Sequence, residues 1–336
     1  MKIAPNTRIK VFVVDNFVWF INIGLYILFM ILVPRGFLSL HNIEFILYVS
    51  SMIGFLVLGE ALVLIAGGID VSLAQNAGLS AMVGGFITGV MAPNLPGWVG
   101  IVIVLVSGMA FGAVNGVLVG KFRYNPFLAT LGTFFVFDWA TFWIRRGAIV
   151  SLPKTFLAPG CATVGGVHVA IFIFVFSALL LHLMLRYTRF GVAVYAVGDN
   201  PEAAAMMGIN VSWVLFWVFT LAGLLAGFSG LLYLGYIGAV TSLIAQNKVM
   251  EAIAGAVLGG ISLRGGRGSI MGALGGTLLL GILDAGLTML NVSPEIRGVL
   301  MGFVLLVAVM INMAISRLRD LILMPNNRAP SEVITK

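Results

Sequence analysis

The sequence is poor in cysteine and in charge. Cys161 is the single cysteine among 336 residues, which excludes a disulfide framework within the chain and any cysteine-rich metal site. Charged residues make up only 9% of the chain, whereas soluble domains carry about 25%. Because 60% of the residues are hydrophobic, the composition predicts an integral membrane protein.

Nucleotide-binding and catalytic motifs are missing as well. No Gly-x-x-x-x-Gly-Lys-Ser/Thr loop occurs, so ATP binding within this chain is not expected. The three histidines stand apart, and no Ser/His/Asp or metal-ligand constellation is found. The net charge of +7 comes from lysines and arginines placed singly or in pairs, which indicates membrane topology rather than nucleic-acid binding. The sequence therefore predicts a protein that is not an enzyme and binds no nucleic acid.

Ten apolar runs approach the roughly 20 residues that a membrane-spanning helix needs. They are Phe17–Val33, Phe45–Ala66, Ala77–Ala92, Trp98–Leu118, Phe127–Ile144, His168–Leu185, Trp213–Tyr236, Met250–Leu263, Ile270–Leu290 and Gly298–Ile315. The third and eighth are short, and the eighth could be a broken or re-entrant segment. The first lacks a small-residue cleavage site and is interpreted as a retained helix, not a signal peptide. We expect one all-α membrane domain over residues 1–336.

Basic residues predict the orientation of these spans. With the N-terminus inside, thirteen lysines and arginines fall on the inner side of ten crossings and six, including Lys248 and Arg297, on the outer side. Both termini are therefore expected in the cytoplasm. The loop 186–212 would also face the cytoplasm, and the charged tail from about 317 to 336 is expected to be disordered.

Within that loop, the stretch 198–211 carries the start and stop signals of a short helix. Asp199 or Asn200 can cap its start, Pro201 suits the first helical position, and Glu202 favours the positive end of the helix dipole. Gly208 can adopt the left-handed conformation that ends a helix. Taken alone, the stretch is either a simple connection or a peg that docks into a soluble partner.

Two glycine-rich segments share the tripeptide Gly-Gly-Ile. Ile65–Ser72 ends one apolar run and offers Asp70 or Ser72 as the cap of the next helix, and Val257–Ser269 follows the eighth run. A glutamate precedes each segment, which is a weak hint of internal duplication. Both copies would run the same way through the membrane, unlike an inverted repeat. The glycines inside the apolar runs indicate close helix packing.

Three carboxylates, Glu60, Asp138 and Asp284, lie inside apolar runs. A charge at the bilayer centre costs roughly 3 kcal/mol, so such residues are candidates for function. A proton-coupled secondary carrier would use Glu60 and Asp284 as relays. Against this reading, we expect no membrane-embedded lysine or arginine to pair with them. The proton-coupled carrier is the alternative from another functional class.

The segment Asn125–Thr133 predicts a helix that starts at Pro126, with Thr130 and Thr133 one turn apart on one face. Their hydroxyls either bond back to their own helix or line a polar path for a hydroxylated solute. The candidates for this path are Asn125, Phe127, Thr130, Thr133 and Phe134.

As a set, four segments resemble the ribose-type permease family, the membrane subunits of binding-protein-dependent ABC importers for monosaccharides and related compounds. They are Gly67–Ser72, Asn125–Thr133, the stretch 198–211 and Ala252–Ser269. The resemblance implies an inner-membrane, multi-pass permease without a cofactor of its own. It also implies a cytoplasmic ATPase that binds ATP and Mg, an extracytoplasmic solute-binding protein, and a second permease chain, identical or related.

The resemblance further assigns roles to residues. In this family the loop between the sixth and seventh helices holds the coupling helix, which contacts the ATPase. The corresponding residues here are Asn200, Pro201, Glu202, Ala203, Ala204, Ala205, Met206, Met207 and Gly208. The glycine-rich segments contribute the structural motif residues Gly67, Gly68, Asp70, Ser72, Gly259, Gly260, Gly265, Gly266 and Gly268.

The expected solute is a ribose-like monosaccharide or a similar small hydroxylated compound, with autoinducer-2 or a nucleoside within the same range. One departure from the family pattern is Val71–Asn76, where members often have Ser-Val-Gly-Ser. Branched-chain amino acid permeases share the glycine-rich segment, so such an amino acid is the alternative substrate. The Gly-Gly-Ile-Asp sequence favours sugars.

Overall fold

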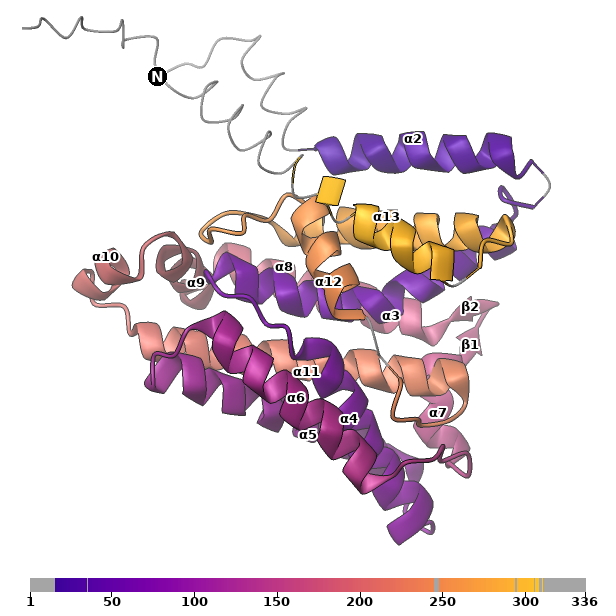
Figure 1. The fold of residues 1–336 in the computed structure, drawn as a ribbon, viewed down its shortest axis with the longest axis horizontal. Helices are drawn as coiled ribbons and strands as arrows, with labels where there is room; N and C mark the ends of the chain where they lie inside the picture. The colour runs from indigo at the N-terminus through magenta and orange to yellow at the C-terminus, as the bar shows by residue number, and fades with distance from the viewer. Residues whose placement is uncertain are drawn as a thin grey trace, which may run out of the picture.

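The computed structural model describes residues 16–310 except 35, 245–247, 294, 305, 308 and 309. These residues are almost entirely helical (Figure 1). The α-helices are α2 (Phe17–Leu32), α3 (Leu40–Ile65), α4 (Leu73–Phe86), α5 (Gly97–Gly116), α6 (Pro126–Ile144), α7 (Lys154–Cys161), α8 (Val169–Tyr187), α9 (Arg189–Asp199), α10 (Pro201–Met206), α11 (Val211–Ile237), α12 (Lys248–Leu258) and α13 (Ile270–Met289). The π-helical turns η1 (Ile87–Met91) and η2 (Val117–Lys121) extend α4 and α5, and β1 (Thr163–Val164) pairs antiparallel with β2 (Val167–His168).

Six helices of the described chain are long and apolar enough to cross a membrane. They are α3, α5 together with η2, α6, α8, α11 and α13, while α2 is apolar but has only 16 residues. An all-α membrane protein is therefore confirmed, and the number of ten crossings stays a prediction. The tail 317–336 lies outside the described residues, as do residues 305, 308, 309 and 311–315 of the tenth apolar run, whose other residues are helical.

The third and eighth apolar runs, which are the two short ones, do not form long uninterrupted α-helices. The third consists of α4, which has 14 residues, and the π-helical turn η1. The eighth contains α12, whose 11 residues reach only about 16 Å. This agrees with the expectation that the eighth run is a broken segment.

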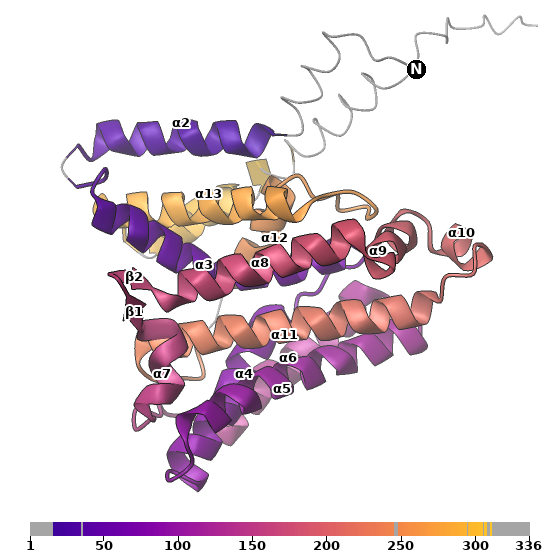
Figure 2. The same cartoon turned by 180° about the vertical axis from the view of Figure 1, so that it is seen from behind.

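Two buried helices, α3 and α11, form the centre of the bundle. α3 packs between α13 and α11, and α11 packs between α3 and α5 (Figure 2). Glycines allow the closest of these contacts, because a Cβ atom on Gly112 of α5 would lie 2.8 Å from the Cα of Gly223 of α11. The interpretation of helix glycines as packing positions is confirmed at this crossing.

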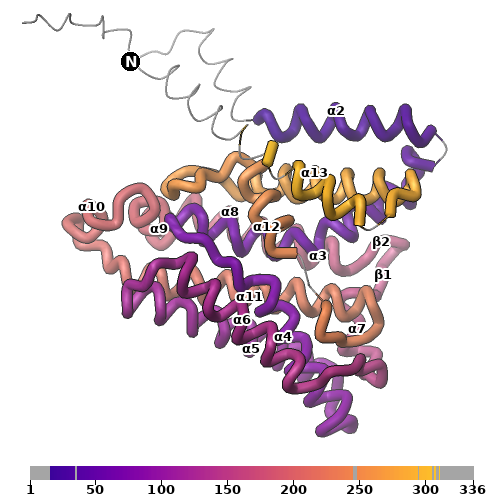
Figure 3. Tube along the Cα trace, in the orientation of Figure 1, coloured from indigo at the N-terminus to yellow at the C-terminus, as the bar shows by residue number. Residues whose placement is uncertain are grey.

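Loops predicted on opposite sides of the membrane lie at opposite ends of the bundle. Figure 3 shows α9 and α10 at one end and β1, β2 and α7 at the other. At the α10 end, the Gly266 N–H donates to the Ile65 carbonyl at 2.9 Å. At the other end, the Tyr48 hydroxyl donates to the Gly160 carbonyl at 2.6 Å, and Ile149 and Val240 form an antiparallel bridge. We call these the inner and outer ends, following the predicted topology.

The chain between α3 and α4 turns back into the bundle. After Ile65, an extended segment returns far enough for the Asp70 N–H to lie 3.4 Å from both carboxylate oxygens of Glu60. Glu60 is five residues before the end of α3, which is about 8 Å of helix. Consequently α4 starts inside the bundle, not at its inner surface.

Candidate functional site

The predicted short helix in the inner loop exists as α10. The Asn200 side chain accepts a hydrogen bond from the Ala203 N–H at 2.9 Å, and Pro201 and Glu202 occupy the first turn. Gly208 follows with a φ of 83°, the left-handed conformation expected at the end of a helix. These local predictions are confirmed, with Asn200 and not Asp199 as the cap.

The helix α10 projects from the inner end and is largely exposed. Of the nine residues assigned to coupling, only Ala204 is buried. Met206 and Met207 are 87% and 83% exposed, which is unusual for large apolar side chains in a loop. An exposed, capped helix with apolar side chains has the form of a surface for a protein partner.

A second helix in the same loop, α9, was not predicted. The Thr188 hydroxyl caps its start by accepting a hydrogen bond from the Gly191 N–H at 3.2 Å. Val194 and Val197 face the core and are buried, so α9 packs against the bundle while α10 protrudes. The signal was present in the spacing of these valines, which is typical of an amphipathic helix.

The end of α9 is held between the two glycine-rich segments. A Cβ atom on Gly198 would collide with the carbonyl of Ile65 and lie 2.7 Å from the Gly266 nitrogen. A Cβ atom on Gly265 would lie 2.7 Å from the Cα of Gly67. The three backbones therefore touch at one point, which we call the glycine junction (Gly67, Gly198, Gly265 and Gly266).

One side chain also ties α9 to the second segment. The Tyr195 hydroxyl donates to the Gly268 carbonyl at 2.9 Å, and burial raises the pKa of this phenol. The remaining motif residues complete the turn: Gly259 packs against the Gly272 backbone, and Gly260 and Gly268 have positive φ. At the end of the turn, the Ser269 side chain caps α13 by accepting from the Gly272 N–H at 3.0 Å.

The segment after Gly67 and Gly68 ends in a buried polar network. Oδ1 of Asp70 accepts hydrogen bonds from the Ser72 N–H at 2.9 Å and the Ser72 hydroxyl at 2.6 Å. Asn115 of α5 donates to the Ser72 hydroxyl at 2.7 Å and accepts from the Thr133 hydroxyl of α6 at 2.7 Å. Ser72 occupies the cap position of α4, but its side chain accepts no hydrogen bond from that helix. The expected cap is thus replaced by a bond to Asp70.

Among the predicted pathway residues, the two threonines form hydrogen bonds with other groups of this chain. The Thr130 hydroxyl donates to the Pro126 carbonyl at 2.9 Å and accepts from the Val71 N–H at 3.3 Å. Thr133 is bound to Asn115, which sequence analysis missed although a lone asparagine inside an apolar run is a visible signal. Asn125 caps α6 and is exposed, Phe127 is 45% exposed, and Phe134 packs partly buried against the core. Whether these residues line a solute path stays a prediction.

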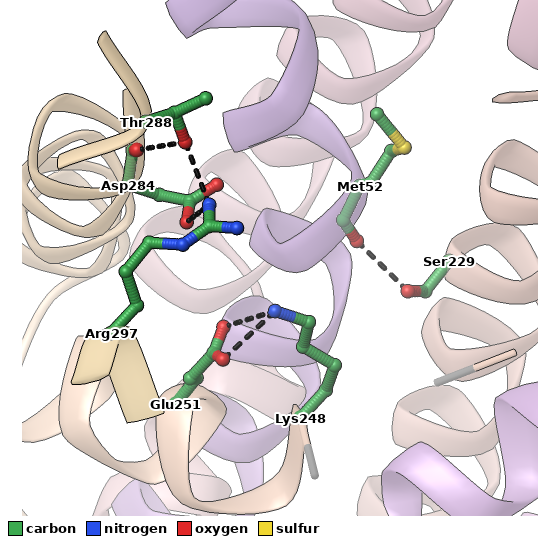
Figure 4. A network of polar contacts seen from close by, with 7 residues as sticks. All are labelled: Met52, Ser229, Lys248, Glu251, Asp284, Thr288 and Arg297. Atoms are coloured by element: carbon green, nitrogen blue, oxygen red, sulfur yellow. Dashed lines mark hydrogen bonds and ion pairs between the residues drawn. The ribbon is translucent and has the colours of Figure 1, made fainter. Parts of the chain in front are cut away.

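The expectation that no membrane-embedded lysine or arginine pairs with the embedded carboxylates did not foresee that Asp284 pairs with Arg297, a residue of an expected outer loop. Nη1 of Arg297 donates to the Asp284 carboxylate at 3.2 Å and to the Thr288 hydroxyl at 2.7 Å (Figure 4). Lys248, expected in an outer loop, is the first residue of α12 and donates to both Glu251 carboxylate oxygens at 2.8 Å. Lys248 pairs with Glu251 because α12 starts within the bundle, where a lysine needs a charged partner.

A metal site is not evident in the described chain. No group of three or more His, Cys, Asp or Glu side chains among its residues could hold a metal ion.

Comparison with known proteins gives matches over most of the chain. The family model described as the permease component of branched-chain amino acid transport systems matches residues 42–309. The ribose import permease RbsC of Bacillus subtilis is 34% identical over 296 residues, which cover 86% of this chain and 91% of that protein. RbsC of Escherichia coli K12 is 33% identical over 282 residues, 82% and 87% of the two chains. The fructose import permease FrcC of Rhizobium meliloti is 31% identical over 295 residues, 85% and 81% of the two chains.

No solved structure gives a significant match. The family match includes both glycine-rich segments, α10 and the buried polar network. The resemblance read from the sequence is therefore confirmed, and the chain belongs to the family of permease components described for branched-chain amino acid transport systems, together with import permeases for ribose and fructose.

Proposed function

We propose that this chain is the membrane-spanning permease subunit of an ATP-driven, binding-protein-dependent importer of a monosaccharide or similar small hydroxylated solute. The relatives named for ribose, fructose and autoinducer-2 import support this assignment. The branched-chain amino acid in the family description is the alternative substrate, and none of the relatives cited above is named for it.

The observation that carries the proposal is the connection of the exposed α10 to the interior through the glycine junction. α10 follows Gly198 by three residues, and Gly198 touches the backbones that lead into α4 and α13. A partner that pushes α10 therefore moves the segments that lead into α4 and α13 directly. Such a push shifts an alternating-access equilibrium only if the two states contact the partner differently, which a protruding rigid helix allows.

The proposal also includes the other subunits of the transporter. A cytoplasmic ATPase binds ATP and Mg and contacts Asn200–Gly208, an extracytoplasmic protein delivers the solute, and a second permease chain completes the pathway. The inner end faces the cytoplasm, because Lys121, Arg123 and the arginines of the 186–189 and 264–267 segments lie there. Both termini then lie in the cytoplasm as well.

Reconstitution tests the proposal. The chain is purified with its cognate ATPase and binding protein and inserted into vesicles, and uptake of radiolabelled D-ribose, D-fructose and D-galactose is measured. We expect accumulation that requires ATP, the ATPase and the binding protein. Accumulation by this chain alone under an imposed proton gradient would instead favour the proton-coupled carrier, with Glu60 and Asp284 as its relays.

A further inference from the structure

A small polar hollow lies where α4, α6 and the segment after α11 meet. Its polar lining consists of Gln75 of α4, Asp138 and Thr141 of α6, and Ser242. The hollow has a volume of about 10 Å³, which is room for one water molecule or one hydroxyl group.

Two polar groups of this hollow lack a partner. Gln75 is only 7% exposed, and its buried Oε1 atom has no hydrogen-bond partner. The carboxylate of Asp138 forms no hydrogen bond or ion pair within the described part of the chain. Leaving a buried polar atom such as Gln75 Oε1 unpaired costs roughly 1–3 kcal/mol, so this atom indicates a role outside folding; Asp138 beside it is only partly buried.

Two of the unpaired groups are hydrogen-bond acceptors, while the Ser242 hydroxyl and the Gln75 amide nitrogen in the same lining can donate. The Gln75 Oε1 and the Asp138 carboxylate accept only, and the Thr141 hydroxyl already donates its proton to the Phe137 carbonyl at 2.8 Å. A ligand that satisfies them must bring hydrogen-bond donors. Solute hydroxyl groups do so, and the ammonium group of an amino acid would do so as well.

The hollow also lies at a break in the helical framework. α4 begins inside the bundle, two residues before Gln75, and Ile244 packs on α4 where a Cβ atom on Gly78 would lie 3.5 Å from its side chain. α12, the other interior helix, starts at Lys248, shortly after Ile244. Interior starts of discontinuous helices are where transport proteins commonly bind their solutes.

A wider cavity opens one helical turn further toward the outer end. It has a volume of about 730 Å³ and is lined by Trp139, Phe142 and Trp143 with Arg145 and Arg146. Its whole lining belongs to one stretch of chain at the end of α6, and Trp139 and Trp143 are 66% and 88% exposed, so it is an open surface cavity whose aromatic faces suit the apolar face of a sugar ring. Asp138 and Phe142 are four residues apart, so α6 connects the wide cavity with the hollow.

We propose that Gln75, Asp138 and Thr141 form a contact point for hydroxyl groups of the solute in transit, and that the aromatic cavity at the end of α6 is its entrance. This inference rests on the proposed function and deepens it, since it assigns side chains of this chain to contact with the solute. The hollow accepts one hydroxyl group of the solute at a time as the sugar ring passes along α6.

The test uses the complete transporter in vesicles, with D-ribose, D-fructose, D-galactose and, as the alternative substrate, leucine as probes. Gln75→Met and Asp138→Asn remove acceptors at nearly constant size. We expect about tenfold less solute carried per ATP hydrolysed, as for the loss of one hydrogen bond worth about 1.4 kcal/mol. ATP hydrolysis stimulated by the binding protein stays within about twofold, because docking and α10 are untouched.

Thermal stability separates this role from a structural one. Gln75→Met removes an unpaired oxygen, so its melting temperature stays equal or rises, whereas a structural glutamine would lower it. Thr141→Val and Thr220→Val form a matched pair, because both hydroxyls are buried and donate to a carbonyl four residues back, at 2.8 and 2.7 Å. Only Thr141 lines the hollow, so only its loss should reduce uptake.

Three results would overturn the contact point: unchanged uptake in both Gln75→Met and Asp138→Asn, equal losses in the two threonine variants, or a melting temperature of Gln75→Met that falls with uptake. In each of these cases wild-type uptake leaves the proposed function standing. If the wild-type complex accumulates none of the three sugars, or accumulates leucine instead, the proposed function fails together with the contact point.

Discussion

Gly198, at the end of α9, lies in backbone contact with Gly67, at the start of the break after α3. A Cβ atom on Gly67 would be 3.3 Å from the Cα of Gly198, and the carbonyl of Ile65 occupies the place of a Cβ on Gly198. No flexible side chain separates the loop that holds α10 from the segment that enters the bundle. A displacement of α9 must therefore move the backbone at Gly67.

Substitution of Gly198 tests this relationship. Gly198→Ala places a methyl group against the Ile65 carbonyl and the Gly266 nitrogen, so we expect a loss of roughly 1–3 kcal/mol in stability and a large fall in uptake per ATP hydrolysed. Gly132→Ala is the control, because this helical glycine has nothing within 4 Å of its Cβ position and should tolerate the methyl group. Uptake and melting temperature are measured together. An equal amount of solute taken up per ATP hydrolysed in both variants would contradict the transmission of force through the glycine junction.

The buried network around Asn115 yields a second prediction. Asn115→Leu removes the donor to the Ser72 hydroxyl and an acceptor of the Thr133 hydroxyl, while Ser72 keeps its bond to Asp70 and Thr133 its bond to the Thr130 carbonyl, so the loss should be roughly 1–3 kcal/mol in total. We expect a clear fall in melting temperature in detergent.

A double variant isolates the coupling within this network. Adding Thr133→Val to Asn115→Leu should cost less than the sum of the single changes, because the two side chains share one bond. Ser107→Ala is a suitable control, since the Ser107 hydroxyl bonds only to its own helix at 2.7 and 3.0 Å. Strict additivity of Asn115→Leu and Thr133→Val would contradict the role of their hydrogen bond.

The exposed helix α10 should be needed for transport but not for insertion. Ala204→Pro removes the N–H that donates to the Asn200 carbonyl at 3.0 Å, and Glu202→Arg reverses the charge in the first turn. We expect both variants to insert into the membrane normally and to lose uptake and ATPase association. Ala205→Ser is the control, because a small side chain at this exposed position keeps the helix. Normal transport by Ala204→Pro and Glu202→Arg would contradict a coupling role.

Local signals in the sequence predicted α10 and the start of α6 well. Asn200, Pro201 and Gly208 act through neighbouring backbone groups, so their effect can be read within a few residues. The glycine junction could not be predicted, because Gly67, Gly198 and Gly265 are far apart in sequence and meet only through packing. Gln75 was missed for a related reason: its significance lies in a missing partner, which appears only when the surrounding helices are in place. The pairing of Asp284 depends on the turn after α13, whose geometry no periodic pattern encodes.

The pair of Asp284 and Arg297 allows a test between the ATP-driven importer and the proton-coupled carrier. The Asp284 carboxylate accepts a hydrogen bond from Arg297 at 3.2 Å (Figure 4). Its side chain is 45% exposed, so the pair should contribute no more than about 1 kcal/mol to stability. We expect Asp284→Asn to lower the melting temperature slightly and to leave ATP-driven uptake within about twofold of wild type. Arg297→Gln should have the same small effect, and the double variant should add nothing further. If Asp284→Asn abolished uptake while Arg297→Gln did not, the carboxylate itself would be required and the carrier mechanism would be favoured.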